Sequence, residues 1–281
     1  MTAKKRNRFT VRFHKIDIQR PFGQPSADKM DSLREVSISL IIPCWQDVEV
    51  AMELGRLWER NALVHEVIIA GVSGHAPSSI VEGRLQFCSA DRPGRGLQFN
   101  LGARAATGDV LLFHHVDSQL TEAHLISLQQ TMRDPKFVGG AFYRKFDERH
   151  PHLRWAEPVE RWHSRTFGTL YGDQSIFVRR RDFIRLGGFA PVPLMEDVEL
   201  SRRVRRAGPI ALLDPPMSTS PARQIAHGAW RTTGRNMLFL FLFQLGVSPY
   251  LLHSWYYRHI TQRDPKADPM QFETETLPTL K

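Results

Sequence analysis

The sequence of 281 residues has few cysteines and no apolar run long enough to span a membrane. Its two cysteines, Cys44 and Cys88, each lie in an apolar, strand-like stretch, so we expect buried, reduced thiols and no disulfide. The basic N-terminus is not followed by an apolar core, which predicts that no signal peptide is present. A cytoplasmic protein is therefore expected.

Several binding motifs are also missing. No GK[ST] sequence occurs, which excludes a P-loop, and the glycines that begin at Gly94 lack the third glycine of a dinucleotide-binding turn. The formal net charge of +9 favours an anionic partner without identifying it. Because no RRM, KH or helix-turn-helix pattern occurs, we expect no nucleic-acid partner.

Strand-like and helical patterns alternate through the first half of the chain. A β-branched apolar run at 36–43 reads as a buried strand. Further strands are expected at 66–70, 85–88 and 110–114, with helices at 48–60 and 94–106 and a Gly/Ser/Pro loop at 71–79. This alternation predicts an α/β fold, a mostly parallel sheet with helices on both faces.

Beyond a helix at 122–132 the order of elements changes. The pattern predicts a strand with one solvated face at 138–146, an aromatic-rich helix at 155–167, a short strand at 175–178 and a helical turn at 182–186. We expect three regions: a basic N-terminal arm at 1–34, a catalytic domain at 35–225, and an apolar helical segment with a tail at 226–281.

A carboxylate pair, Glu196-Asp197, stands where a proline-punctuated loop turns into a basic amphipathic helix that ends at Ala207. Acids at the start of a helix and arginines at its end match the helix dipole, so a well-capped surface helix explains the pattern by itself. The alternative interpretation is a pair of functional carboxylates.

A second candidate site follows the fourth expected strand. Ligands of open parallel sheets bind at the carboxyl ends of the strands, which is where Asp117 lies. His115 and Asp117 offer an imidazole and a hard oxygen ligand, which suit Mn²⁺ or Mg²⁺ on a diphosphate. An Asp that caps the next helix fits as well, and zinc lacks a third ligand at a recognised spacing. Arg95, at a helix start, could meet a phosphate.

Taken in order, seven segments resemble those of family 2 glycosyltransferases with the GT-A fold. They are SLIIPCWQD, EVIIAG, GRGLQFNLGARAATGDVLLFHHVDSQL, VGGAF, YGDQSIFVRR, LGGF and PLMEDVELSRRVRRAG. Within that family the sequence is similar to the small bacterial subgroup labelled as arsenosugar-biosynthesis type, and the similarity covers 36–257. The resemblance implies inverting transfer of a sugar from a nucleotide-sugar donor to an acceptor hydroxyl, assisted by Mn²⁺ or Mg²⁺.

The resemblance also implies roles for individual residues. Asp197 is expected to act as general base, with Glu196 beside it, and Asp173 is expected near the donor sugar and the acceptor. Asp117, with His115, is expected to hold the metal. Donor contacts are expected from Pro43, Asp47, Ser73, Arg95, Asn100, Asp117 and Gln174.

One departure from the family concerns the loop after the second strand. Family members carry an acid there that binds the base and ribose of the donor, whereas no carboxylate occurs from Ala70 to Ile80. Ser73 or His75, or Asp47 and Asp91 from neighbouring strand ends, would have to replace it. The alternative function is a catalytically silent protein of the same fold that binds a sugar nucleotide or an anionic polymer.

The most apolar part of the chain is MLFLFLF at 237–243 with LGVSPYLLHSWYY after it. Gly246 and Pro249 break it too early for a bilayer span, so a helix packed on the core explains it. The alternative is an interfacial helix with Trp255, Tyr256 and Tyr257 at headgroup level. That alternative would suit a lipid-linked acceptor and a peripheral contact with the inner face of the membrane.

Overall fold

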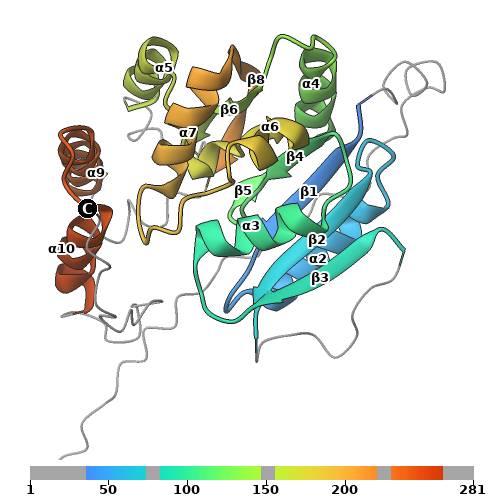
Figure 1. Cartoon of the computed structure of the whole chain (residues 1–281), viewed down its shortest axis with the longest axis horizontal. Coiled ribbons are helices and arrows are strands. Elements are labelled where there is room, and N and C mark those ends of the chain that lie inside the picture. Colours follow the sequence, from blue (N-terminus) through green and yellow to red (C-terminus); the bar gives the residue numbers. More distant parts are fainter. Residues whose placement is uncertain (1–35, 74–82, 147–155, 220–228, 262–281) are drawn as a thin grey trace, which may run out of the picture.

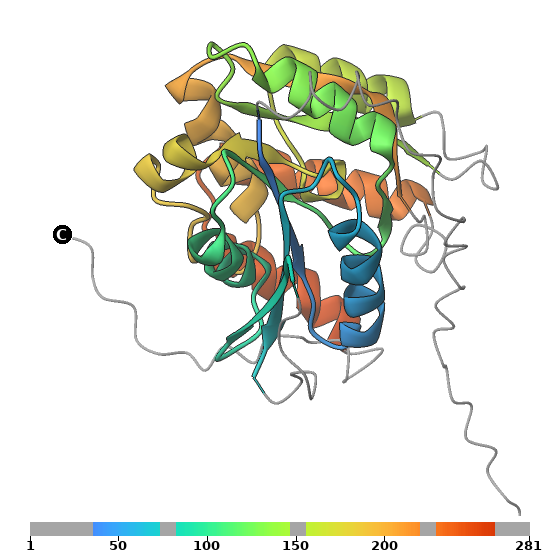
Figure 2. The ribbon, with the colours of Figure 1, turned by 90° about the vertical axis from the view of Figure 1, so that its right-hand side faces the viewer.

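The computed structural model describes residues 36–73, 83–146, 156–219 and 229–261. These residues form one eight-stranded sheet with helices on both faces (Figure 1 and Figure 2). The strands are β1 (Ile38–Pro43), β2 (Glu66–Val72), β3 (Leu85–Ala90), β4 (Val110–Phe113), β5 (Ser118–Gln119), β6 (Gly139–Phe146), β7 (Phe177–Arg179) and β8 (Ile210–Thr219). The helices are α2 (Val48–Glu59), α3 (Arg95–Ala105), α4 (Glu122–Met132), α5 (Ala156–Phe167), α6 (Arg180–Arg185), α7 (Glu196–Ala207), α9 (Ala229–Gln244) and α10 (Pro249–Thr261), with a 3-10 turn, η2 (Gly172–Gln174).

Four strands, in the order β3-β2-β1-β4, run parallel to one another. Every residue of β1, β2 and β4 is buried, as expected for strands covered on both faces. The α/β fold predicted from alternating strands and helices is confirmed. Because the strands are parallel, their carboxyl ends meet at one edge of the sheet, the edge where such sheets bind ligands.

Alternate residues of β1 face two separate cores. Ile38, Leu40 and Ile42 lie in a core with residues of α2 and α4, whereas Ile41 lies in a second core with residues of α3, α6 and α7. Close packing of α3 on β1 requires Gly102, because a methyl group there would lie 2.4 Å from Ile41 Cγ2. The two helices that carry site residues, α3 and α7, therefore share one face of the sheet.

The remaining strands are mixed in direction. Strand β7 runs antiparallel to β4 and β6, β8 runs parallel to β6, and β5 pairs antiparallel with β8. The sequence pattern did not reveal β8, because Pro215 and Pro216 lack the N–H groups that a ladder needs. The register between β6 and β8 shifts between Phe142 and Arg144, and prolines are tolerated at such irregularities.

The boundary of β2 differs from the prediction. The strand continues to Val72, so the loop expected from Gly71 begins at Ser73. Gly71 is a packing residue of the strand, since a methyl group there would lie 2.3 Å from Phe87 Cζ. His75 lies outside the described residues.

Both cysteines are free, as predicted, but only Cys44 is buried, and Cys88 is partly exposed. Burial raises the pKa of Cys44 to about 12, with help from Asp47, and raises that of Cys88 to about 11. Neither thiol therefore forms a reactive thiolate near neutral pH.

Helices α9 and α10 pack against each other beside the sheet (Figure 1). Within the described parts of the chain, no helix is long and apolar enough to cross a membrane. Phe239, Leu240 and Leu252 are buried, as a packed helix requires. Large exposed apolar side chains also occur on this pair and in the turn between its helices: Leu238, Phe241, Leu245, Tyr250, Leu251 and Trp255. The predicted N-terminal arm at 1–34 lies outside the described residues.

Candidate active site

The carboxylate pair predicted from the sequence lies in the first turn of α7. Asp197 is held by two backbone groups: the Gly172 N–H donates to its Oδ2 atom and the Val198 N–H to its Oδ1 atom, both at 2.8 Å. The first N–H groups of a helix lack intrahelical partners, so the start of α7 provides one of these donors. The other donor comes from η2, which lies 25 residues earlier in the chain.

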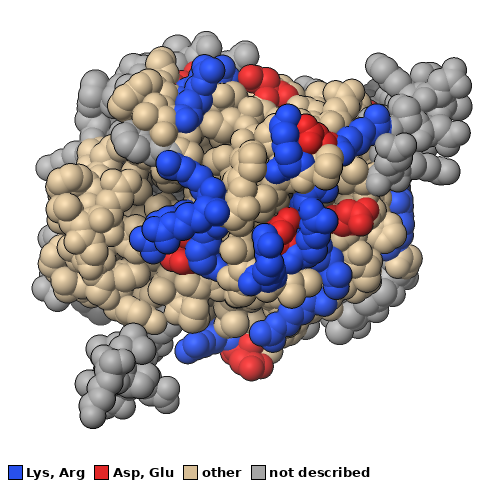
Figure 3. Space-filling view, turned by 45° about the horizontal axis from the view of Figure 1, so that its top comes forward, with Lys and Arg blue, Asp and Glu red and all other residues tan. Residues whose placement is uncertain are grey.

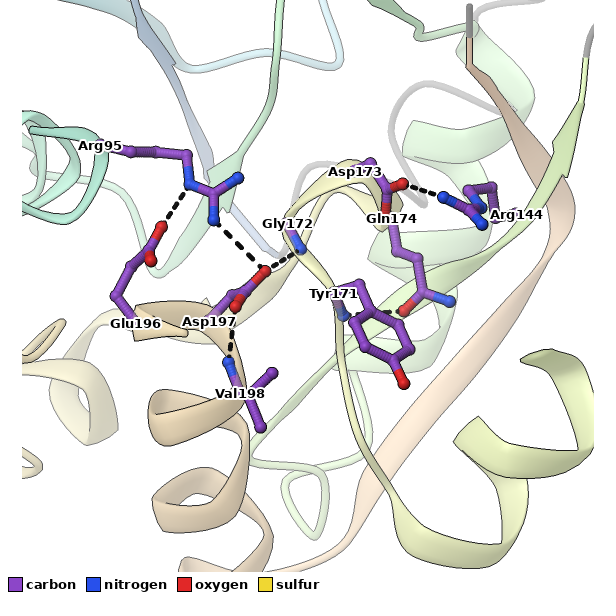
Figure 4. Close-up of polar contacts among 9 residues, drawn as sticks. All are labelled: Arg95, Arg144, Tyr171, Gly172, Asp173, Gln174, Glu196, Asp197 and Val198. Carbon is purple, nitrogen blue, oxygen red and sulfur yellow. Dashed lines mark hydrogen bonds and ion pairs between the residues drawn. The ribbon is translucent and has the colours of Figure 1, made fainter. Parts of the chain in front are cut away.

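Arg95, the first residue of α3, reaches the same pair (Figure 4). Its Nε atom donates to Glu196 Oε1, and its Nη2 atom lies 3.5 Å from Asp197 Oδ2. Both carboxylate side chains are largely buried, at 4% exposed for Glu196 and 13% for Asp197. The sequence suggested a phosphate partner for Arg95, whereas here its guanidinium lies against two carboxylates.

The surroundings give Asp197 a perturbed pKa. Burial raises the pKa of its carboxyl above the ordinary value of 3.8, the Arg95 guanidinium lowers it, and the Glu196 carboxylate raises it again. The net result is a raised pKa. A carboxylate with a raised pKa is a stronger base, which is the property that a general base near neutral pH needs.

The turn η2 brings Asp173 and Gln174 close to the carboxylate pair. Asp173 forms an ion pair with Arg144 of β6, and Gln174 Oε1 accepts a 3.0 Å hydrogen bond from the Tyr171 N–H. Arg144 gave no signal in the sequence, because its partner lies 29 positions away. Figure 4 shows these contacts next to those of Asp197.

Two residues with left-handed backbone lie directly beside these segments. Among the described non-glycine residues, Ser175 (φ 51°) and Met195 (φ 66°) have positive φ. Ser175 follows η2, and its Oγ atom lies 2.8 Å from Nδ1 of the buried His114. Met195 precedes Glu196. Such conformations are costly for residues other than glycine and concentrate at functional sites.

The metal-binding residues expected from the sequence lie between β4 and β5. Asp117 is exposed, and Ser118 Oγ donates to its Oδ1 atom at 3.4 Å. The interpretation of Asp117 as a helix cap is wrong, because Thr121 is the N-cap of α4. The His115 ring packs 5.3 Å from that of Phe99, and its Nε2 atom is inaccessible. Of the two, Asp117 is the side chain placed to receive a ligand from solvent.

The described residues contain no group of three or more side chains that could hold a metal ion. The exposed Asp117 carboxylate is one hard oxygen ligand of the kind that Mg²⁺ accepts together with water and substrate phosphates.

The other expected donor contacts fall into two groups. Pro43, Asp47 and Ser73 lie at the carboxyl ends of β1 and β2, the edge where donors bind in such sheets. Asn100 instead holds the backbone of Phe189, with bonds of 2.9 and 2.8 Å, and so fixes the loop before α7. Gln98 was missed in the sequence: its Nε2 atom donates to the carbonyls of Cys44 and Ala70 at 2.6 and 2.7 Å and ties α3 to β1 and β2.

Comparison with known families gives a match over part of the chain. Residues 80–186 match the sequence model of the family described as Glycosyl transferase family 2. The matched segment spans less than half of the chain. The enzymatic class that it indicates is glycosyl transfer. No curated protein matches the sequence significantly.

Solved glycosyltransferase structures share the fold. The 1–349 form of S. aureus TarS is 13% identical, with a TM-score of 0.51, and the match covers 80% of this chain and 74% of that one. The same form in complex with UDP-GlcNAc is 14% identical, with a TM-score of 0.51, over 66% of this chain and 58% of that one. Mannosyltransferase PcManGT from Pyrobaculum calidifontis, in complex with GDP-Man and Mn²⁺, is 18% identical over 79% of this chain and 70% of that one, with a TM-score of 0.49. At these identities the TarS structures show the fold alone, which is that of GT-A glycosyltransferases.

Proposed function

We propose that the protein transfers a sugar from a nucleotide-sugar donor to an acceptor hydroxyl with inversion, and that Asp197 is the general base. The observation that carries this proposal is the setting of Asp197, a largely buried carboxylate with a raised pKa held by two backbone N–H groups beside a glycosyltransferase segment. As base, Asp197 takes the proton of the acceptor hydroxyl. The acceptor oxygen attacks the anomeric carbon of the donor sugar as the bond from that carbon to the nucleoside diphosphate breaks. The subgroup likeness to arsenosugar-type enzymes remains a prediction.

Asp173 and Gln174 are proposed to contact the donor sugar and the acceptor. The support is their position in η2, whose Gly172 N–H is bonded to Asp197. Glu196 shares Arg95 with Asp197, so its proposed role is to orient the base rather than to react. The donor base and sugar are not fixed by these contacts.

Asp117 is proposed to hold a Mn²⁺ or Mg²⁺ ion with the donor diphosphate. When bound, such an ion neutralises the charge that develops on the leaving diphosphate. The test is thermal stabilisation by a nucleoside diphosphate with and without Mn²⁺. Asp117→Ala should abolish the extra stabilisation that Mn²⁺ gives to the parent, and equal stabilisation of both proteins would remove Asp117 from this role.

A peripheral contact with the inner face of the membrane, and with it a lipid-linked acceptor, is proposed for α9 and α10. The support is the exposed apolar surface of this pair. In Figure 3, uncharged surface occupies the side on which α9 and α10 lie in Figure 1, and Lys and Arg side chains gather next to it. Apolar surface beside basic residues is typical of proteins that bind anionic bilayers.

Vesicle sedimentation tests the membrane contact. The parent should bind vesicles that contain anionic lipid more strongly than neutral vesicles, and Phe241→Glu, on α9, should weaken this binding. Ile184→Glu is the matched control, because Ile184 is equally exposed but lies on α6 (57% against 56% exposed). Equal binding by both variants would contradict the proposed surface.

The proposed reaction is tested by Asp197→Asn, which keeps the shape of the side chain and removes its basicity. Turnover should fall on the order of a hundredfold or more while donor affinity stays near that of the parent. Glu199→Gln is the control, because Glu199 lies on the same helix and pairs with Arg203. Near-normal turnover in Asp197→Asn would exclude Asp197 as base, and donor binding without turnover in the parent would favour the silent binding protein.

A further inference from the structure

Two of the three guanidinium nitrogens of Arg95 contact the carboxylate pair. Its Nε atom donates to Glu196 and its Nη2 atom lies 3.5 Å from Asp197 Oδ2, while its Nη1 atom lies beside Gly172. A methyl group on Gly172 would lie 3.1 Å from Nη1 and 3.3 Å from Asp197 Oδ2. The glycine therefore allows η2, α3 and α7 to meet at one point.

The planar fork of an arginine suits this arrangement, because it can hold two acceptors in a fixed relation. Burial lowers the pKa of Arg95, but the Glu196 and Asp197 carboxylates raise it by more than burial lowers it. The net pKa is therefore raised, and the guanidinium stays charged. A phosphate that takes the Nε or Nη2 atom must replace a contact with Glu196 or Asp197. Positioning of Asp197 and binding of phosphate therefore compete for these two nitrogens.

We propose that Arg95 is a positioning residue for Asp197: it holds the carboxylate in place for proton transfer and does not bind the donor diphosphate. This inference rests on the proposed role of Asp197 as general base. Arg95 acts through Asp197 and Glu196, and the Gly172 N–H fixes the same Asp197 oxygen from the other side. Replacement of Arg95 should therefore change turnover and the pH profile.

The direction of the pH effect follows from the charged groups around Asp197. These groups are Arg95 from α3, Glu196 from α7 and Asp173 from η2, and Asp173 is itself paired with Arg144 of β6. Loss of the cation leaves Asp197 facing carboxylates, so its pKa rises. Because the base must be deprotonated, the acid limb of kcat/KM then moves to higher pH.

The experiment compares Arg95→Gln and Arg95→Lys with the parent. In Arg95→Gln, kcat should fall at least tenfold, the acid limb should move up by roughly one pH unit, and donor affinity should stay within threefold of the parent. Arg95→Lys keeps the charge but loses the fork, so its acid limb should stay close to the parent's while kcat falls. Arg104→Gln, at the exposed far end of α3, is the control and should change none of these values.

Three results bear on the outcome. A tenfold or greater loss of donor affinity with an unmoved acid limb would overturn the proposal and make Arg95 a phosphate ligand. In the Asp197→Asn background, Arg95→Gln should cause no further loss of kcat, and an additive loss would also overturn it. If Arg95→Gln does not fold, Gly172→Ala, which presses on both Nη1 and Asp197 Oδ2, should lower kcat without weakening donor binding.

The failure of this inference differs from that of the proposed reaction. Normal turnover in Asp197→Asn would remove the base and leave Arg95 nothing to position. Loss of turnover in Asp197→Asn together with a parental kcat and pH profile in Arg95→Gln would leave the base intact and refute only the positioning role.

Discussion

The two halves of the sheet are built on different rules. In the parallel half, formed by β3, β2, β1 and β4, the buried Glu66 carboxylate joins neighbouring segments of the chain. It accepts hydrogen bonds from Ser39 Oγ at 2.7 Å and from the Thr107 N–H at 2.6 Å. In the mixed half, formed by β7, β6, β8 and β5, paired polar groups such as Asp173 and Arg144 lie beside the candidate site. The carboxyl ends of the parallel strands lie at one edge, and the mixed half contributes the Asp173–Arg144 pair next to Asp197.

The largest test of this difference is acid pH, because two buried histidines with lowered pKa values, His114 and His124, contact residues at the mixed half. Burial lowers the pKa of His114 to about 3 and that of His124 to about 4. Both pKa values lie below the ordinary histidine value of 6.5. Between pH 6.5 and the lowered pKa, the unfolded chain therefore binds more protons than the folded one. Stability that is present above pH 6.5 is lost as the pH falls through this range. At pH 5 the expected loss is about 2 kcal/mol for each residue.

Denaturant unfolding at pH 7 and pH 5 measures this loss. His124→Gln is the matched variant: the His124 side chain accepts from the Thr121 N–H in a capping box, a role that glutamine also fills, and glutamine does not titrate. The acid loss should drop by about half in this variant. An unchanged pH dependence would show that His124 is not the acid-sensitive group. In a separate measurement at acid pH, the amides of β6 and β8 should exchange hydrogen before those of β1 and β2.

The second test adds one methyl group to each half. In Gly140→Ala the new methyl would lie 2.0 Å from the Ala211 carbonyl oxygen, which is backbone and cannot yield without moving β8. In Gly71→Ala it meets the tip of the Phe87 ring, on the edge strand β3, which can turn aside. We expect destabilisation of about 3 kcal/mol or more for Gly140→Ala and about 1 kcal/mol for Gly71→Ala. Thermal unfolding of both variants checks the order, and a loss for Gly71→Ala equal to or larger than that for Gly140→Ala would show that the Phe87 ring cannot move aside.

The smallest test addresses donor recognition at the edge of the parallel half. An acid restored after β2 belongs at the exposed Ser73, because a larger side chain at Gly71 would clash with Phe87. Ser73→Asp should tighten UDP binding about tenfold through a charge-assisted hydrogen bond, and should tighten other nucleotides less. Ala105→Asp, at the exposed end of α3, controls for added charge. Tight UDP binding by the parent with no gain in Ser73→Asp would show that another group already fills this role.

The comparison also explains what the sequence could predict. Apolar runs such as 36–43 predict the parallel strands, and the acids at 196–197 predict the start of α7. Both kinds of element could therefore be identified from the sequence. Strand β8 was missed because Pro215 and Pro216 cannot donate hydrogen bonds to a neighbouring strand. The irregular pairing with β6 that tolerates them is visible only in the structure. The contact of Arg95 with Glu196 joins residues 101 positions apart, and no local spacing reveals it.

Gly71 shows a different limit. A glycine after a strand-like run is usually a turn residue, and its packing against Phe87 becomes visible only when β2 and β3 are paired. The left-handed backbone at Met195 gave no signal for the same kind of reason. Methionine carries no preference for that conformation, and the surrounding loop and helix impose it.

The left-handed residues also limit how this protein can change during evolution. At 175 and 195, substitutions to Gly, Asn or Asp are compatible with the backbone, whereas valine, isoleucine and threonine are disfavoured there. At 195 the constraint comes from φ, whereas at 175 the buried Ser175 Oγ also lies 2.8 Å from His114 Nδ1. Related chains that keep η2 and the start of α7 should therefore exclude β-branched residues from both positions and vary in side-chain chemistry mainly at 195.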